Sequence, residues 1–138
     1  MRLRLLAVGR RRDDYCSPQI AEYLKRSRTL LPIELLTYRD EAAMLRAASR
    51  PRVVLDERGH QWTSERLARY LDEQRQASRT TVDFLVGAAD GFGDATRRDA
   101  DLVLGLSRLT LPHRLVHLIV AEQLYRAGTI LAGHPYHR

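Results

Sequence analysis

A glycine-rich segment, Gly87–Gly93, directly follows an apolar run and is the first candidate for ligand binding. It holds three glycines in seven residues, and glycine lets the backbone adopt positive φ angles and approach a ligand closely. The spacing is not G-x-G-x-x-G, and no Lys-Ser/Thr pair follows, so neither a dinucleotide site nor a triphosphate site is indicated. The segment therefore indicates either a cofactor loop of another kind or an ordinary glycine-rich turn.

The connection Leu106–His113 is a second candidate, because apolar residues recur in it where a polar turn is expected. We expect Leu109 and Leu111 to be buried beneath another part of the chain. A loop of this kind offers backbone N–H and C=O groups beside an apolar wall, and that combination suits an adenine ring. The alternative is a buried loop that binds nothing.

The last 32 residues, Ser107–Arg138, form a local basic segment with an unusual end. Glu122 is their only acidic residue, and the i,i+4 spacing predicts that it pairs with Arg126 on a helix. The tail combines an aromatic ring, two imidazoles and a guanidinium, namely those of Tyr136, His134, His137 and Arg138. Such planar groups stack on unpaired bases and hold phosphates, so the tail is a candidate RNA-binding segment. The alternative is a solvated chain end.

Metal chemistry and the common hydrolase arrangements are not indicated. The chain has no Ser-His-Asp order and no H-E-x-x-H motif. His134 and His137 have a metal-like spacing but no third ligand near them, and Cys16 is the single cysteine, so we expect no metal.

The composition favours one soluble domain with an anionic partner. The 138 residues suit a single domain over 1–138, and 44% hydrophobic with 29% charged residues is typical of a globular chain. The net charge is +6, and Lys25 is the only lysine among 23 basic residues. Arginine forks onto phosphate and stacks on bases, which favours nucleic acid as the partner, although an arginine-favouring genome would give the same count. No apolar run is long enough for a membrane span or a signal peptide, so we expect a cytoplasmic protein without membrane contact.

Alternating strands and helices would position these candidates. The predicted strands are Leu3–Val8, Ile33–Tyr38, Val53–Leu55, Thr81–Val86 and Leu102–Leu106. The predicted helices begin at Ser17-Pro18, Glu41, Ser64, Asp94 and Pro112, with Ser17 and Ser64 as amino-terminal caps, and the last and longest ends at Gly128. This order predicts an α/β fold, a parallel sheet with helices on both faces. Ligands of such sheets lie beyond the carboxyl ends of the strands, where loops 55–62, 87–93 and 106–113 are expected to meet.

The same segments resemble a known family. The strongest matches are Leu109–His113, Ala121–Ala127 and His134–Arg138; Met1–Gly9, Leu55–Gly59 and Gly87–Gly91 match more loosely. Over nearly its whole length the chain resembles the RlmH family, the bacterial pseudouridine N3-methyltransferases of large-subunit ribosomal RNA in the SPOUT superfamily. It departs from the family pattern at Ala88, where a second glycine is usual.

The resemblance implies a C-terminal trefoil knot, a homodimer whose subunits share the active site, and S-adenosylmethionine (S-adenosyl-L-methionine) as methyl donor. The implied substrate is 23S ribosomal RNA on the assembled ribosome. The implied cofactor contacts are Leu55, Gly87, Leu106, Ser107, Arg108, Leu109, Thr110 and Leu111. The implied RNA contacts are His134, Tyr136, His137 and Arg138.

No single catalytic residue is indicated. His113, His134 and His137 are candidate bases for the N3 proton, because imidazole titrates near neutral pH. Arg108 or Arg138 could instead stabilise the anionic base. Two alternatives to the main interpretation are a non-catalytic RNA-binding or ribosome-binding protein that kept the fold, and a SPOUT methyltransferase with another RNA target.

Overall fold

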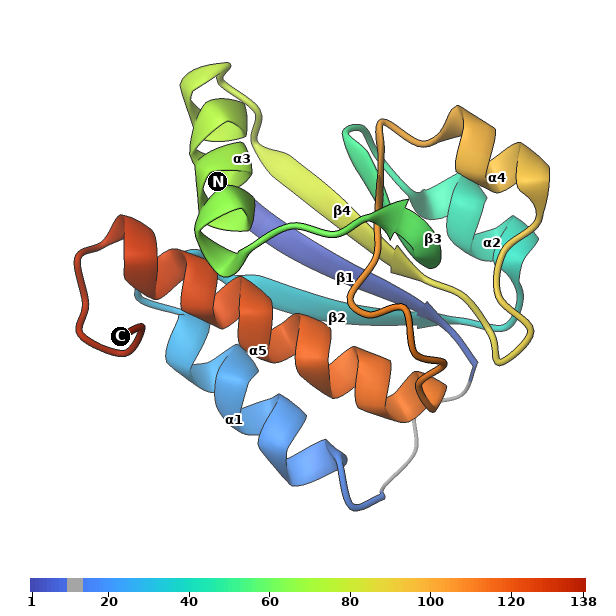
Figure 1. Ribbon diagram of the computed structural model, residues 1–138, viewed down its shortest axis with the longest axis horizontal. Helices are drawn as coiled ribbons and strands as arrows, with labels where there is room; N and C mark the ends of the chain where they lie inside the picture. The colour runs from blue at the N-terminus through green and yellow to red at the C-terminus, as the bar shows by residue number, and fades with distance from the viewer. Residues whose placement is uncertain (10–13) are drawn as a thin grey trace.

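Five parallel strands form one sheet at the centre of the computed structural model, which describes residues 1–9 and 14–138 (Figure 1). The strands are β1 Arg2–Val8, β2 Ile33–Tyr38, β3 Arg52–His60, β4 Thr81–Val86 and β5 Leu102–Leu104. Their order across the sheet is β2-β1-β4-β3-β5, and every pairing is parallel. The predicted α/β class and parallel sheet are therefore confirmed.

Helices cover both faces of the sheet, as predicted. The helices α1 Ser17–Ser27, α3 Ser64–Gln76 and α5 His113–Leu131 pack together on one face, with α5 between the other two (Figure 1). The shorter helices α2 Glu41–Ala47 and α4 Asp94–Asp99 lie on the opposite face.

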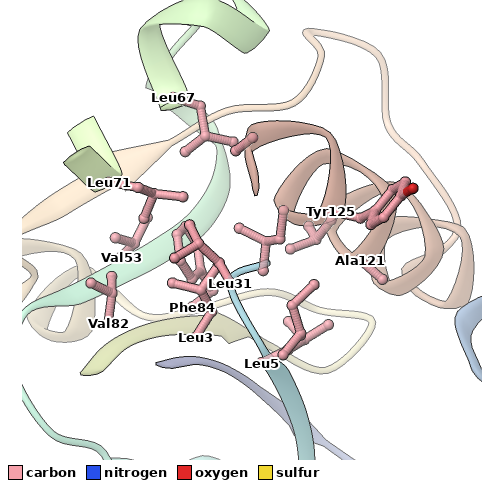
Figure 2. Packing of buried hydrophobic residues seen from close by; sticks show 14 of the residues in the cluster. Leu3, Leu5, Leu31, Val53, Leu67, Leu71, Val82, Phe84, Ala121 and Tyr125 are labelled. Carbon is pink, nitrogen blue, oxygen red and sulfur yellow. The ribbon is translucent and has the colours of Figure 1, made fainter. Parts of the chain in front are cut away.

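Side-chain alternation along the inner strands creates two apolar layers. Leu3 and Leu5 of β1 face α3 and α5 with Phe84 of β4, as Figure 2 shows, and all three are fully buried. Leu6 and Leu85 point to the other face and pack with α2. Strands buried on both faces read as largely apolar runs, which is why the sequence predicted these two strands well, and the charged exceptions Arg4 and Asp83 form an ion pair with each other.

The edge of the sheet at β3 and β5 differs from the prediction. The predicted strand Val53–Leu55 extends to His60. Leu104 pairs with both Leu55 and His60, so residues 56–59 bulge out between them. The Gly105 N–H donates to the His60 carbonyl at 2.9 Å, and β5 ends at Leu104, two residues earlier than predicted. These pairings join residues far apart in the chain, and local patterning carries no signal for them.

Two helix caps differ from the prediction by one residue, and the end of the last helix differs by three. Thr63, not Ser64, caps α3, because its Oγ1 accepts from the Arg66 N–H at 3.1 Å. Ser17 is the first residue of α1 and Cys16 is its cap. The last helix continues past Gly128 to Leu131. A Cβ at Gly128 would lie 3.3 Å from the Leu30 Cβ, so the glycine lets α5 pack closely against Leu30. It does not end the helix.

Candidate active site

A cleft of about 250 Å³ lies where the carboxyl ends of β3 and β4 meet the chain after β5. All three loops singled out in the sequence contribute to its wall: residues 55–58, residues 86–92 and most of residues 106–113. The cleft therefore occupies the place that the parallel topology predicts for a ligand.

Seven of the eight predicted cofactor contacts line this cleft: Leu55, Gly87, Leu106, Ser107, Leu109, Thr110 and Leu111. Arg108 does not. It is exposed and borders a neighbouring open hollow beside Trp62. The loop 106–109 thus lies between the cleft and this hollow, and Arg108 lines the hollow but not the cleft.

The predicted burial of Leu109 is wrong. Its side chain is 74% exposed, Thr110 is exposed and Leu111 is half-buried. The loop does not pack under another part of its own chain; it presents apolar surface at the rim of the cleft. This leaves aliphatic surface available to a bound molecule or to a second protein chain.

Gly87 is closely surrounded. A Cβ at this position would lie 3.3 Å from the Gly91 carbonyl carbon and 3.3 Å from the ring of Phe92. Gly91 has φ +77°, which L side chains rarely adopt. The backbone angle favours glycine at position 91, and a side chain at position 87 would displace Phe92 or Gly91, whereas Ala88 is exposed on the cleft wall.

The cleft wall carries three carboxylates, at Asp56, Glu57 and Asp90. Asp56 forms an ion pair with Arg97 of α4 at 3.3 Å, and its side chain is 9% exposed. Glu57 is exposed and accepts a 3.4 Å hydrogen bond from the Thr110 hydroxyl, so it bridges two of the loops. Arg97 also lines the cleft, although its weak helical segment carried no signal of a site.

The amino-terminal end of α5 borders the cleft through His113 and Val116. One turn on, His117 is 4% exposed, and its ring lies edge-on to His113 with centroids 5.7 Å apart. Burial, with the positive charge of Arg114 nearby, lowers the pKa of His117 to about 4. The ring is neutral at physiological pH, with Nδ1 accepting from Arg114 at 2.9 Å. Arg114 is held in turn by Asp14 at 2.6 Å.

The C-terminal tail lies at the other end of α5. The nineteen residues of this helix span roughly 28 Å, so the tail is far from the cleft of its own chain (Figure 1). His134 and Arg138 are exposed. The four predicted RNA contacts are thus grouped together, but apart from the predicted cofactor contacts.

Two tail residues are held by the folded protein. The Tyr136 hydroxyl donates to Glu122 Oε1 at 3.0 Å, while its ring lies edge-on to Tyr125 and beneath the Arg126 guanidinium. Glu122 also accepts from Arg126 at 2.6 Å, which confirms the predicted pair. His137 lies between Arg126 at 3.0 Å and the Glu65 carboxylate of α3 at 2.7 Å. The tail is therefore docked, not frayed, a result that the sequence pattern did not predict.

Within residues 1–9 and 14–138, no three His, Cys, Asp or Glu side chains come together as a metal site. None of the helices that the structure describes is both long and apolar enough to span a membrane.

Comparison with known proteins agrees with this fold. The family described as "Predicted SPOUT methyltransferase" matches residues 1–137. A solved structure of a probable methylase family protein from Haemophilus influenzae Rd KW20 shares the fold, with a TM-score of 0.58 over 99% of this chain and 70% of that one, at 11% identity. The protein is an enzyme of the SPOUT methyltransferase class.

Relatives of matching length narrow the class further. A protein of Thermus thermophilus is 46% identical over 142 residues, which cover 100% of this chain and 99% of the relative. Proteins of Thiobacillus denitrificans and Geobacter metallireducens are 42% and 40% identical, covering 100% and 99% of this chain and 99% of each relative. All three are called ribosomal RNA large subunit methyltransferase H. The chain therefore belongs to the ribosomal RNA large subunit methyltransferase H family of SPOUT methyltransferases.

Proposed function

We propose that the protein transfers a methyl group from S-adenosylmethionine to N3 of a pseudouridine in 23S ribosomal RNA, in the cytoplasm and on the assembled ribosome. The observation that carries this proposal is the convergence of the three predicted loops on one cleft. The relatives act, by their names, on the ribosomal RNA of the large subunit.

The residues around the cleft suit this cofactor. Leu106–Leu111 would hold the adenine with backbone groups and aliphatic contact, and the tight turn at Gly87 would let the backbone approach the ligand. S-adenosylmethionine carries a sulfonium and an ammonium, and Glu57 and Asp90 place negative charge on the cleft wall. When bound, the cofactor would supply an electrophilic methyl group, whose transfer depends mainly on proximity and orientation.

The N3 proton must leave as the methyl group arrives. His113 is the only one of the three candidate bases that lines the cleft of its own chain. His134 and His137 lie beyond the far end of α5 and could reach a cleft only in a second copy of the chain. The same holds for the positive charge of Arg138.

We propose a homodimer for this reason. Antiparallel packing of two α5 helices would bring the tail of one subunit to the cleft of its partner, so both halves of the site would be complete only in the pair. Leu115 and Ile119 favour this arrangement, since both are half-buried and neither packs in the two core layers of the chain.

We also propose that the chain is knotted, as the family resemblance implies. Support comes from Gly105, where a Cβ would lie 3.1 Å from the carbonyl oxygens of both Asp56 and Gly59. The chain after β5 thus lies tightly against the bulge of β3, as a passage through that bulge would require. A larger residue at Gly105 would block this passage, so Gly105→Val should prevent folding.

Ribosomes from cells that lack this methylation provide the test. They are incubated with the protein and S-adenosylmethionine, and any new methyl group is located by mass spectrometry of the RNA. A new methyl group on N3 of a pseudouridine in 23S RNA is expected, and it should be absent with the Gly87→Val variant. A methyl group elsewhere would favour another RNA target, and ribosome binding without methylation would favour a non-catalytic role.

A further inference from the structure

Arg97, in the short helix α4, connects two walls of the cleft. Its Nη1 donates to the Phe92 carbonyl at 2.5 Å and to Asp56 Oδ2 at 3.3 Å, and its Nη2 pairs with Asp94. Phe92 belongs to the glycine-rich loop, whereas Asp56 directly follows Leu55 in the bulge of β3. One guanidinium therefore joins segments that are more than thirty residues apart.

Both contact points lie beside predicted cofactor contacts. Phe92 is 6% exposed, and its ring would be 3.3 Å from a Cβ at Gly87, so the position of Phe92 determines the shape of the turn there. The Asp56 carboxylate also accepts the Arg58 N–H at 2.9 Å, which shapes the bulge after Leu55. A change in the Arg97 contacts would alter both walls at once.

The contacts of Arg97 favour a positioning role over direct ligand binding. Its side chain is only 15% exposed, and both terminal nitrogens already donate to the protein. A planar guanidinium holds its acceptors in fixed directions and donates to Asp94 through its second terminal nitrogen, whereas an ammonium is a compact charge on a flexible stem.

We propose that Arg97 is a positioning residue of the cofactor cleft, which holds the glycine-rich loop and the loop after β3 at the separation that S-adenosylmethionine requires. This inference rests on the proposed function, because it is tested by binding of S-adenosylmethionine, which depends on the distance between these two loops. Arg97 acts through Phe92 and Asp56 and does not itself take part in methyl transfer.

Titration calorimetry with S-adenosylmethionine on the full-length protein tests this role. Arg97→Gln should weaken cofactor binding about tenfold or more, because hydrogen bonds to a charged group are lost from both walls. Arg97→Lys keeps the charge without the fork and should bind with intermediate affinity. The control is Arg98→Gln, since Arg98 is the next residue of α4, is exposed and has no ion pair with a described residue.

Two further measurements separate positioning from general stability. In ribosome methylation, Arg97→Gln should raise KM for the cofactor about tenfold while kcat stays within about twofold, and its melting curve should stay cooperative. Adding Asp56→Asn to Arg97→Gln should cost little more, because the two side chains act as one unit.

Unchanged cofactor affinity in Arg97→Gln, or an equal loss in Arg98→Gln, would overturn this inference and leave the proposed function standing. A loss of kcat at saturating cofactor would overturn it too, since the residue would then act in the transfer step. No binding by the unmodified protein would overturn the proposed function, and the inference with it.

Discussion

Removing one hydroxyl from the tail should separate tail docking from cofactor binding. In Tyr136→Phe the ring keeps its contacts with Tyr125 and Arg126. The variant loses the 3.0 Å hydrogen bond to Glu122 and the hydroxyl's interaction with Tyr23. A hydrogen bond to a charged group contributes about 1.5–3 kcal/mol when buried. The Glu122 side chain is 17% exposed, so we expect the lower end, about 1.5 kcal/mol, which is roughly a tenfold shift from docked to free tail.

Amide hydrogen exchange measured by NMR reports this shift directly. The His134 N–H donates to the Thr129 carbonyl at 2.9 Å and should exchange about tenfold faster in the variant, while amides of the central strands stay unchanged. Cofactor affinity should not change, because the predicted cofactor contacts lie in the loops around the cleft and none lies in the tail, but ribosome methylation should fall. The matched control is Tyr15→Phe, because Tyr15 is 74% exposed.

The reasoning would be refuted if the variant methylated ribosomes normally with an undocked tail, since docking would then have no role in the reaction. A loss of cofactor affinity with an intact tail would refute it as well, because it would place Tyr136 at the cofactor.

Three further predictions follow from burial and packing. Burial lowers the pKa of His117 to about 4, so the folded state binds fewer protons than the unfolded state between about pH 4 and 6.5. The free energy of unfolding is therefore highest above pH 6.5 and decreases by roughly 3 kcal/mol as the pH falls through this window. Urea unfolding at several pH values should show this loss, and His117→Leu should remove it. Gly87→Val should abolish cofactor binding in calorimetry because the side chain has no room beside Phe92, while a matched Ala88→Val, on the exposed cleft wall, should retain folding and measurable binding. Sedimentation at micromolar concentration should give a dimer, and Ile119→Arg should give a monomer of unchanged fold; a native monomer would contradict the proposed assembly.

Hydrophobic periodicity and the rules of parallel-sheet topology were sufficient to predict the sheet and the position of the cleft. Thr81–Val86 is buried on both faces and has the same bounds in the structure as in the prediction. Once parallel strands are recognised, their carboxyl ends share one edge, so loops far apart in the sequence are expected to meet there. This rule needs no knowledge of side-chain contacts, which explains why it brought Leu55, Gly87 and Leu106 together correctly.

The prediction failed where contacts between distant segments decide the structure. The extension of β3 to His60 depends on pairing with Leu104 and Gly105, and Leu109 is exposed because nothing in its own chain covers the loop. Docking of the tail likewise depends on Glu65, which is 72 residues away from His137. None of these distant pairings has a local sequence pattern.

The structure also distinguishes arginines that form ion pairs within the fold from arginines that are available to an anionic partner, which the composition alone does not. Many arginines form ion pairs within the fold, with Arg4 to Asp83 at 2.5 Å as the most buried case. These side chains form contacts within the folded chain and are not available to an anionic partner. By contrast, Arg58, Arg108 and Arg138 have no ion pair with any described residue. Arg58 lies on the cleft wall, and Arg108 lies in the neighbouring hollow. Arg138 lies on the tail that a partner subunit would bring to the cleft in the proposed dimer. Part of the unpaired positive charge that could hold RNA phosphates therefore lies beside the proposed reaction site, so loss of these three arginines should reduce methylation without changing stability.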